Sequence, residues 1–257
     1  MKTQIFAVLA ASTIAAGPAM AQQFNGATVS GAFQSLDDES VGEYEVTSFA
    51  GGVEFGISTD FAIGANAEII SSDDFEDDFF IGTVHGMYTA APGTTFGVFY
   101  ASETFDDFDT DILGIEGAFT TANSTFEGYL GAVDSDYFGD QDVLRMLGLS
   151  LEFGVGSGVS LGIEYESFRL EDGGVVVDTG EREDASLTDT ALFARYSFAQ
   201  GASVYAKAGR ERLFGSDRDD NLRLVGVNST EYVTVGAEFD FGAGTTFGSR
   251  SLFNFGG

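Results

Sequence analysis

Apolar residues recur at every second position along most of this chain, and this alternation limits its possible folds more than any other feature. In one segment Val53, Phe55 and Ile57 are apolar, whereas Glu54 lies on the opposite face. A period of two is typical of a β-strand whose two faces meet different environments. No stretch after residue 21 shows a sustained helical period, and the repeated alternation predicts twelve strands. We therefore expect an all-β fold.

The predicted strands are joined by two kinds of connection that alternate along the chain. The short connections are rich in Ser, Thr, Asn, Pro and Gly, as tight turns require, and lie near residues 58–60, 90–94, 120–124, 155–158 and 199–201. The long connections are all acidic, and lie near residues 35–43, 71–78, 103–111, 134–142, 169–186 and 213–229. This alternation predicts an antiparallel up-and-down order, with the short turns and both termini at one end.

The first 21 residues have the three parts of a secretory signal peptide. Lys2 gives a positive start, Ile5–Ala16 form an apolar stretch, and residues 19–21 are a small-x-small cleavage site. We expect cleavage after Ala21, so that an exported chain of 236 residues (257 minus 21) begins at Gln22.

The composition narrows the class of protein. The chain carries 11 Lys and Arg against 41 Asp and Glu, so it lacks the basic patches that a general nucleic-acid binder needs. It has no cysteine, and an exported protein of this composition must be stable without disulfide bonds. A hydrophobic content of 44% argues against a disordered acidic chain.

Alternation alone does not decide which face lies inside. A secreted β-sandwich buries its apolar face, whereas a membrane barrel turns that face to lipid. An even number of strands, the alternating connections and strands of roughly 9–11 residues favour the barrel. Aromatic residues also gather beside the short turns, as in the girdle at a membrane interface. They are Phe55, Phe61, Tyr88, Phe96, Phe119, Phe126, Phe153, Phe198, Phe239 and Phe241.

In its layout the chain resembles Gram-negative outer-membrane porins, especially the small, acidic, cysteine-free porins of alphaproteobacteria. The resemblance covers the export signal, the alternating strands, the acidic connections and a last strand, YVTVGAEFDF, that ends in an aromatic residue. It implies a transmembrane antiparallel β-barrel over residues 22–242, with short periplasmic turns and long acidic extracellular loops. Residues 243–257 depart from the pattern, and are either a tail or part of the closing strand.

If the apolar faces meet lipid, the opposite faces line the lumen. The candidate pore-lining residues are Glu54, Glu68, His85, Glu116, Glu127, Glu152, Glu164, Asp189, Arg195, Lys207 and Glu238. The acids Glu166, Glu211 and Asp240 share this register. Rings of carboxylates focus a negative potential and favour cations. Two interpretations stay open: a water-filled path, or charges that pair with one another and fill a narrow barrel.

Three arginines fall on the lipid-facing register near the long connections, namely Arg145, Arg210 and Arg212. At the outer interface such side chains can reach the phosphates of lipopolysaccharide. The alternative is that the register slips there and the arginines belong to the loops.

The acidic connections could associate loosely with Ca²⁺ or Mg²⁺. Asp107, Asp109 and Asp111 occupy alternate positions, as the first ligands of an EF-hand loop do. Ile112 stands where such a loop needs glycine, so simple solvated charge is the alternative. The chain has one histidine, His85, in the middle of a predicted strand on its polar face. That position fits a structural or pore-lining role better than catalysis, and we expect no enzymatic activity and no other cofactor.

These observations favour an outer-membrane porin that passes small hydrophilic solutes passively and prefers cations. Its partners would be outer-membrane lipid, lipopolysaccharide and the solutes, but not nucleic acid, and a homo-oligomer stays open. The alternative is a non-conducting structural or adhesive barrel whose acidic loops face the medium.

Overall fold

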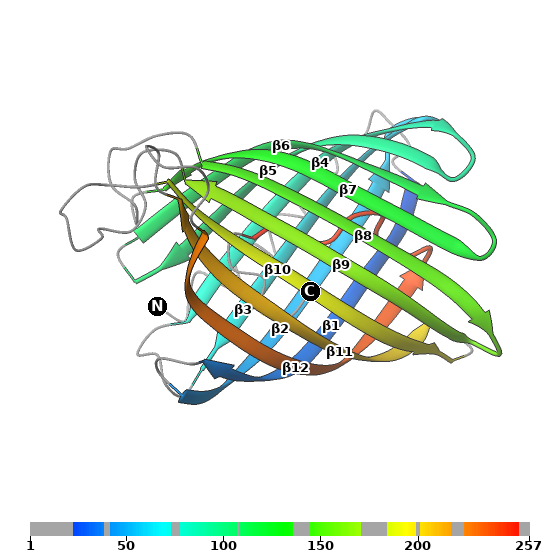
Figure 1. Cartoon of the computed structure of the whole chain (residues 1–257). Helices are drawn as coiled ribbons and strands as arrows, with labels where there is room; N and C mark the ends of the chain where they lie inside the picture. The colour runs from blue at the N-terminus through cyan, green and yellow to red at the C-terminus, as the bar shows by residue number, and fades with distance from the viewer. Residues whose placement is uncertain are drawn as a thin grey trace.

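The computed structural model describes residues 23–38, 42–72, 78–106, 108–135, 144–170, 184–198, 201–216 and 224–251. Within these residues twelve strands form one closed antiparallel barrel, in which each strand pairs with its neighbours in the chain and β1 pairs with β12 (Figure 1). The predicted up-and-down barrel of twelve strands is confirmed. The predicted signal peptide at residues 1–21 lies outside the described residues.

The strands are longer than the alternation alone suggested. They are β1 Gln23–Asp38, β2 Gly42–Gly56, β3 Phe61–Ser71, β4 Phe79–Ala91, β5 Thr94–Phe105, β6 Phe108–Thr120, β7 Ser124–Ser135, β8 Leu144–Gly156, β9 Val159–Leu170, β10 Asp184–Ser197, β11 Ala202–Ser216 and β12 Leu224–Gly242. No helix in the described ranges is long and apolar enough to cross a membrane.

The barrel closes through a long pairing of its first and last strands. β1 and β12 are in register from Gly26 opposite Gly242 to Asp38 opposite Thr230. Closure satisfies the backbone hydrogen bonds that an open sheet leaves exposed at its edges, and those groups would be costly in lipid.

The outer surface of the barrel is apolar, as the sequence predicted. Large side chains such as Phe49, Leu113 and Leu192 are 67%, 65% and 64% exposed. Each would gain about 1 kcal/mol or more by leaving water. All but one of the predicted girdle aromatics are exposed, and Phe55, half-buried, lies against Phe24 at the short-turn end. Such a surface is suited to lipid and unsuited to water.

The short turns lie together at one end of the barrel, on the right in Figure 1. In one of them the Ser58 hydroxyl accepts hydrogen bonds from the backbone N–H groups of Asp60 and Phe61. In another, Gly93 has a φ of +77°, and a Cβ there would lie 2.2 Å from the carbonyl oxygen of Thr120. Local turn chemistry therefore sets this end.

The strands continue into two stretches that the sequence assigned to long connections. The acidic connection predicted at 103–111 shrinks to residues 106 and 107, because β5 and β6 pair up to Phe105 opposite Phe108. Asp109 and Asp111 are outward strand residues that accept hydrogen bonds from the hydroxyls of Thr104 and Tyr100, at 3.0 and 2.7 Å. Likewise β1 and β2 reduce the connection at 35–43 to residues 39–41.

Candidate functional site

The candidate site is the lumen of the barrel. The structure places every predicted pore-lining residue on the inward face. Glu54, Glu68, His85, Glu116, Asp189 and Lys207 are buried, whereas Glu127, Glu152, Glu164, Arg195 and Glu238 line open space inside the barrel. Their part in conduction stays a prediction.

The segment that follows β12 turns back into the lumen. β12 ends at Gly242, and residues 243–251 form no strand. The turn depends on Gly242 and Gly244, whose φ angles are +68° and +74°. It also depends on Gly26, where a Cβ would lie 2.2 Å from the carbonyl oxygen of Gly244. We call residues 243–251 the luminal segment; its red trace lies within the barrel in Figure 1.

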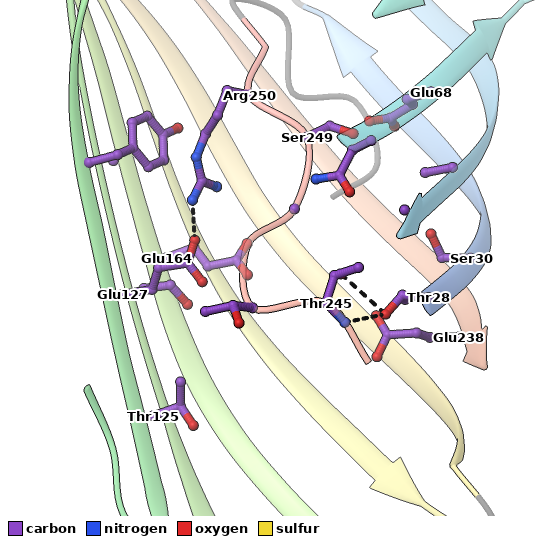
Figure 2. A pocket seen from close by; sticks show the side chains of 18 of the residues that line it. Thr28, Ser30, Glu68, Thr125, Glu127, Glu164, Glu238, Thr245, Ser249 and Arg250 are labelled. Carbon is purple, nitrogen blue, oxygen red and sulfur yellow. Dashed lines mark hydrogen bonds and ion pairs between the residues drawn. The ribbon is translucent and has the colours of Figure 1, made fainter. Parts of the chain in front are cut away.

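One side of the luminal segment is hydrogen-bonded to the wall formed by β1, β2 and β3. The backbone N–H of Thr245 donates to Thr28 Oγ1 at 3.0 Å, and that of Thr246 donates to Glu54 Oε2 at 2.9 Å. The side-chain amide of Asn66 donates to the carbonyl oxygen of Phe247 at 2.9 Å. Figure 2 shows Thr245 reaching towards Thr28 on this wall. These bonds satisfy backbone groups that would otherwise be left without partners in the lumen.

Phe247 seats the middle of the luminal segment. Its side chain is 2% exposed and packs with Met87 and Ala118. Its ring stacks on that of His85, with ring centroids 5.9 Å apart. His85 Nδ1 lies 2.7 Å from Glu116 Oε1, and its Nε2 lies 3.1 Å from the side-chain nitrogen of Asn66. Both ring nitrogens of His85 therefore make contacts that hold the segment and its wall together.

Arg250 ties the end of the luminal segment to the opposite wall. Its guanidinium donates to Glu116 Oε2 from Nε at 3.1 Å and from Nη2 at 2.9 Å, and also bonds Glu127. It lies over the ring of Tyr129, with Cζ 4.5 Å from the ring centroid. The residue is 6% exposed, and its backbone N–H donates to the Thr83 hydroxyl at 3.1 Å. Buried charges need such pairing to be stable in a protein interior.

The two basic residues that the sequence placed in the lumen are paired rather than open. Arg195 bonds Glu238 at 2.5 Å and lies 3.8 Å from Glu152. Lys207 is buried and lies 3.3 Å from Glu164. Each therefore neutralises nearby carboxylates on its own side of the barrel.

Two cavities remain beside the luminal segment. One, of about 370 Å³, has walls of Glu68, Glu127, Glu152, Glu164 and Arg195 (Figure 2). The other, of about 580 Å³, opens towards the short turns, where Gly93 and Gly201 line it. Both are lined by Glu152, Arg195, Glu238, Thr245 and Thr246. The half of the lumen near the short turns is thus a carboxylate-rich space that the luminal segment partly fills.

In the other half of the lumen, buried apolar side chains lie beside buried polar ones such as Gln34, Glu103 and Thr110, and the sequence analysis did not anticipate the apolar part. Two clusters of buried side chains face inward towards the long-connection end. One contains Phe99, Ala101, Ile112, Tyr129, Val133, Met146 and Phe168, and the other contains Leu36, Val46, Ile70, Ile81, Ala191 and Tyr232. We call these two clusters the apolar layer. An apolar constriction can block ions by excluding water.

The remaining candidate residues lie on the outer surface. Arg145 and Arg212 are exposed, Arg210 is partly exposed, and all three keep the outward register near the long-connection end. Asp107 lies outside the described residues. No cluster of three or more His, Asp or Glu side chains suited to a metal ion occurs in the described part of the chain.

Sequence reasoning missed Arg250, although it left a signal. Residues 242–257 contain a single charged side chain, and it is basic, in a chain whose predicted lumen has many more acids than bases. A lone basic residue that follows such a barrel has unpaired carboxylates within reach if the tail folds inward.

Comparisons with known proteins support the fold. No protein-family model matches the sequence, and no curated protein sequence matches it. Among solved structures, the KdgM porin in complex with disordered oligogalacturonate matches 82% of this chain and 98% of its own, with a TM-score of 0.55 and 8% identity. The NanC porin matches 81% of this chain and 98% of its own, with a TM-score of 0.55 and 9% identity. The chain therefore has the barrel fold of outer-membrane porins, and the narrower likeness to alphaproteobacterial porins stays a prediction.

Proposed function

We propose that this chain forms a passive channel in the outer membrane of a Gram-negative bacterium, and that it passes small hydrophilic solutes with a preference for cations. The lipid-suited exterior and the fold shared with porins support the location. One observation carries the channel: the barrel encloses open space lined by Glu127, Glu152, Glu164 and Glu238. Polar, charged space inside a barrel is what a hydrophilic solute requires.

The cation preference rests on the balance of charge in the lumen. Arg195 and Lys207 pair with carboxylates of the barrel, and Arg250 of the luminal segment pairs with two more. Further inward acids, among them Glu68 and Glu103, are buried on the same face. The electrostatic potential in the lumen is therefore negative, and a negative potential in a narrow, poorly screened space attracts cations.

The solute of the KdgM porin does not transfer to this chain. Oligogalacturonate is a polyanion, because each of its units carries a carboxylate. A lumen rich in Glu side chains would repel it, so the shared fold carries no shared substrate here.

We further propose that the luminal segment limits the size of the solutes that pass. Its residues Thr245 and Thr246 line both the cavity of about 370 Å³ and the cavity of about 580 Å³. Solutes larger than small hydrated ions would have to displace it.

The apolar layer favours a second candidate function, a barrel that does not conduct. Leu36 and Ile112 are fully buried in the lumen, and side chains of this kind fill narrow barrels. Planar-bilayer recordings of the purified protein separate the two candidates. Stepwise conductance with a cation-selective reversal potential supports the channel, and a membrane that stays silent with correctly folded protein supports the structural barrel.

A further inference from the structure

Four arginines gather on one part of the outer surface of the barrel, near the long-connection end. They are Arg145 on β8, Arg169 on β9, and Arg210 and Arg212 on β11. Arg145 lies directly opposite Arg169 in the register. The whole chain has only 11 Lys and Arg and a net charge of −30, so a local excess of arginine on an outward face needs an explanation.

Strand β10 lies between Arg169 and the two arginines of β11, and its outward residues at the height of these arginines are Ser186, Thr188 and Thr190. Ser186 is opposite Arg169, and Thr188 is opposite Arg212. Neighbouring strands are about 4.8 Å apart, so arginines two strands apart can converge on one group about 10 Å across. The hydroxyls of β10 leave room for that group and can donate hydrogen bonds to it.

The height of the arginines matches the outer membrane interface. On β8, Arg145 lies eight residues (153 − 145) from Phe153, which belongs to the aromatic girdle at the short-turn end. On β11, Ala202 pairs with the girdle residue Phe239, and Arg212 lies ten residues (212 − 202) from Ala202. With a tilt of about 40°, each residue rises about 2.5 Å along the barrel axis. The arginines therefore lie about 20–25 Å from the inner girdle, which is close to the roughly 25 Å height of the apolar band of such barrels.

Carboxylates lie on the strands next to the arginines, near the same end of the barrel. Asp37 on β1 lies opposite Glu43 on β2 and Glu231 on β12, and all three are exposed. Glu231 lies directly opposite Arg210 and forms an ion pair with it, so the change from arginines to carboxylates falls between β11 and β12. An anionic partner is expected to contact only the arginine side.

We propose that Arg145, Arg169, Arg210 and Arg212 form a site for the phosphate groups of lipopolysaccharide in the outer leaflet. A guanidinium binds phosphate through two parallel hydrogen bonds, and it is the side chain best suited to this geometry. Arg210 is already oriented by two residues of β12, since its Nε donates to the Ser229 hydroxyl at 2.6 Å and lies 3.8 Å from Glu231 Oε1. The site depends on the proposed membrane location and not on conduction.

Retention of lipopolysaccharide by the purified, folded full-length protein tests this site. The protein is loaded with lipopolysaccharide in detergent containing EDTA, which removes bridging divalent cations, and the lipid that remains bound is quantified by native mass spectrometry. We expect the variant R145Q/R169Q/R210Q/R212Q to bind at least about tenfold less tightly than the unchanged protein. The matched control D37N/E43Q alters the same rim on β1 and β2, away from the arginines, and is expected to bind at least as well as the unchanged protein.

A second arm avoids any dependence on the folding of the variant. The unchanged protein is offered intact lipopolysaccharide and the same lipid with its phosphates removed enzymatically. Preferential binding of the phosphorylated lipid supports the site. Equal binding of the two lipids, or undiminished binding by the folded quadruple arginine variant, overturns it. Conductance plays no part in either readout, so the outcome is separate from that of the proposed channel.

Discussion

Arg250 holds the luminal segment across the barrel, and its removal is the most informative perturbation of the lumen. In Arg250→Ala, Glu116 and Glu127 lose the guanidinium that bonds both of them, and Glu116 is 5% exposed. Removing one partner from a buried ion pair costs about 3–5 kcal/mol, because the remaining charges stay buried without compensation. That cost falls on the inserted state of the segment, since the two carboxylates can regain water when it leaves.

A cost of about 3 kcal/mol shifts the balance between inserted and released segment by more than about a hundredfold towards release. Release would widen the space of both cavities, because Thr245 and Thr246 line each of them. Single-channel recordings in planar bilayers should then show a higher conductance, or a higher fraction of open time, for Arg250→Ala than for the unchanged protein. A chain that ends at Gly242 should behave in the same way, because it keeps the whole of β12.

Two variants control this experiment. Arg145→Ala removes the same charge from the outer surface and should leave conductance unchanged, because Arg145 faces away from the lumen. Arg250→Lys keeps the charge without the planar fork, and should lie between the unchanged protein and Arg250→Ala. Equal conductance of Arg250→Ala, the shortened chain and the unchanged protein would refute the view that the segment restricts the lumen.

Three further predictions address selectivity, seating of the segment and packing of the lumen. The double variant Glu152→Gln/Glu238→Gln removes two carboxylates that line both cavities, and should move the reversal potential in a salt gradient towards zero. An unchanged reversal potential would contradict the proposal that lumen carboxylates set the cation preference. Phe247→Ala removes a ring that is 2% exposed and should weaken insertion of the luminal segment by about 3–5 kcal/mol. Added protease should then cleave the luminal segment faster, whereas Phe241→Ala on the outer surface, the control, should leave the rate of cleavage unchanged. Gly148→Ala places a Cβ 2.1 Å from the ring of Tyr129 and should destabilise the fold by about 1–3 kcal/mol. The temperature at which the protein changes its mobility in detergent gels should therefore fall. Gly154→Ala on the same strand is the control and should leave this temperature unchanged, because the atom nearest to its Cβ lies 3.7 Å away.

The barrel could be predicted from sequence because its outer face obeys one rule along its whole length. Leu113 and Ile115 are exposed at 65% and 58%, and they occupy alternate positions, as the period of two requires of a lipid-facing side. Turn residues such as Gly93 mark the short connections through local backbone geometry. Signals of this kind lie within a few residues of one another, so the sequence displays them directly.

The apolar layer could not be predicted, because its residues interrupt the alternation on which the interpretation relied. Leu36 and Ile112 face inward and are fully buried, whereas Ser35, Asp37 and Asp111 beside them face outward. The alternation therefore reverses its polarity near the long-connection end, and a rule that places every apolar residue on the lipid face fails there. The strand ends were placed too early near residues 103–111 because Asp109 and Asp111 take outward strand positions rather than loop positions.

The luminal segment was hidden for a different reason. Its contacts join positions that are far apart in the chain, since Arg250 meets Glu116 across 134 residues and Glu127 across 123. No local period or turn marks a segment that lies against a wall built from other strands. Only the charge balance, one Arg after a barrel rich in carboxylates, pointed in that direction.

The central claim is that the acidic lumen conducts and prefers cations, and the reversal potential of the reconstituted protein in a KCl gradient tests it most directly. We predict discrete conductance steps and a reversal potential of the sign set by K⁺. Correctly folded protein that gives no steps, or steps whose reversal potential follows Cl⁻, would contradict the claim.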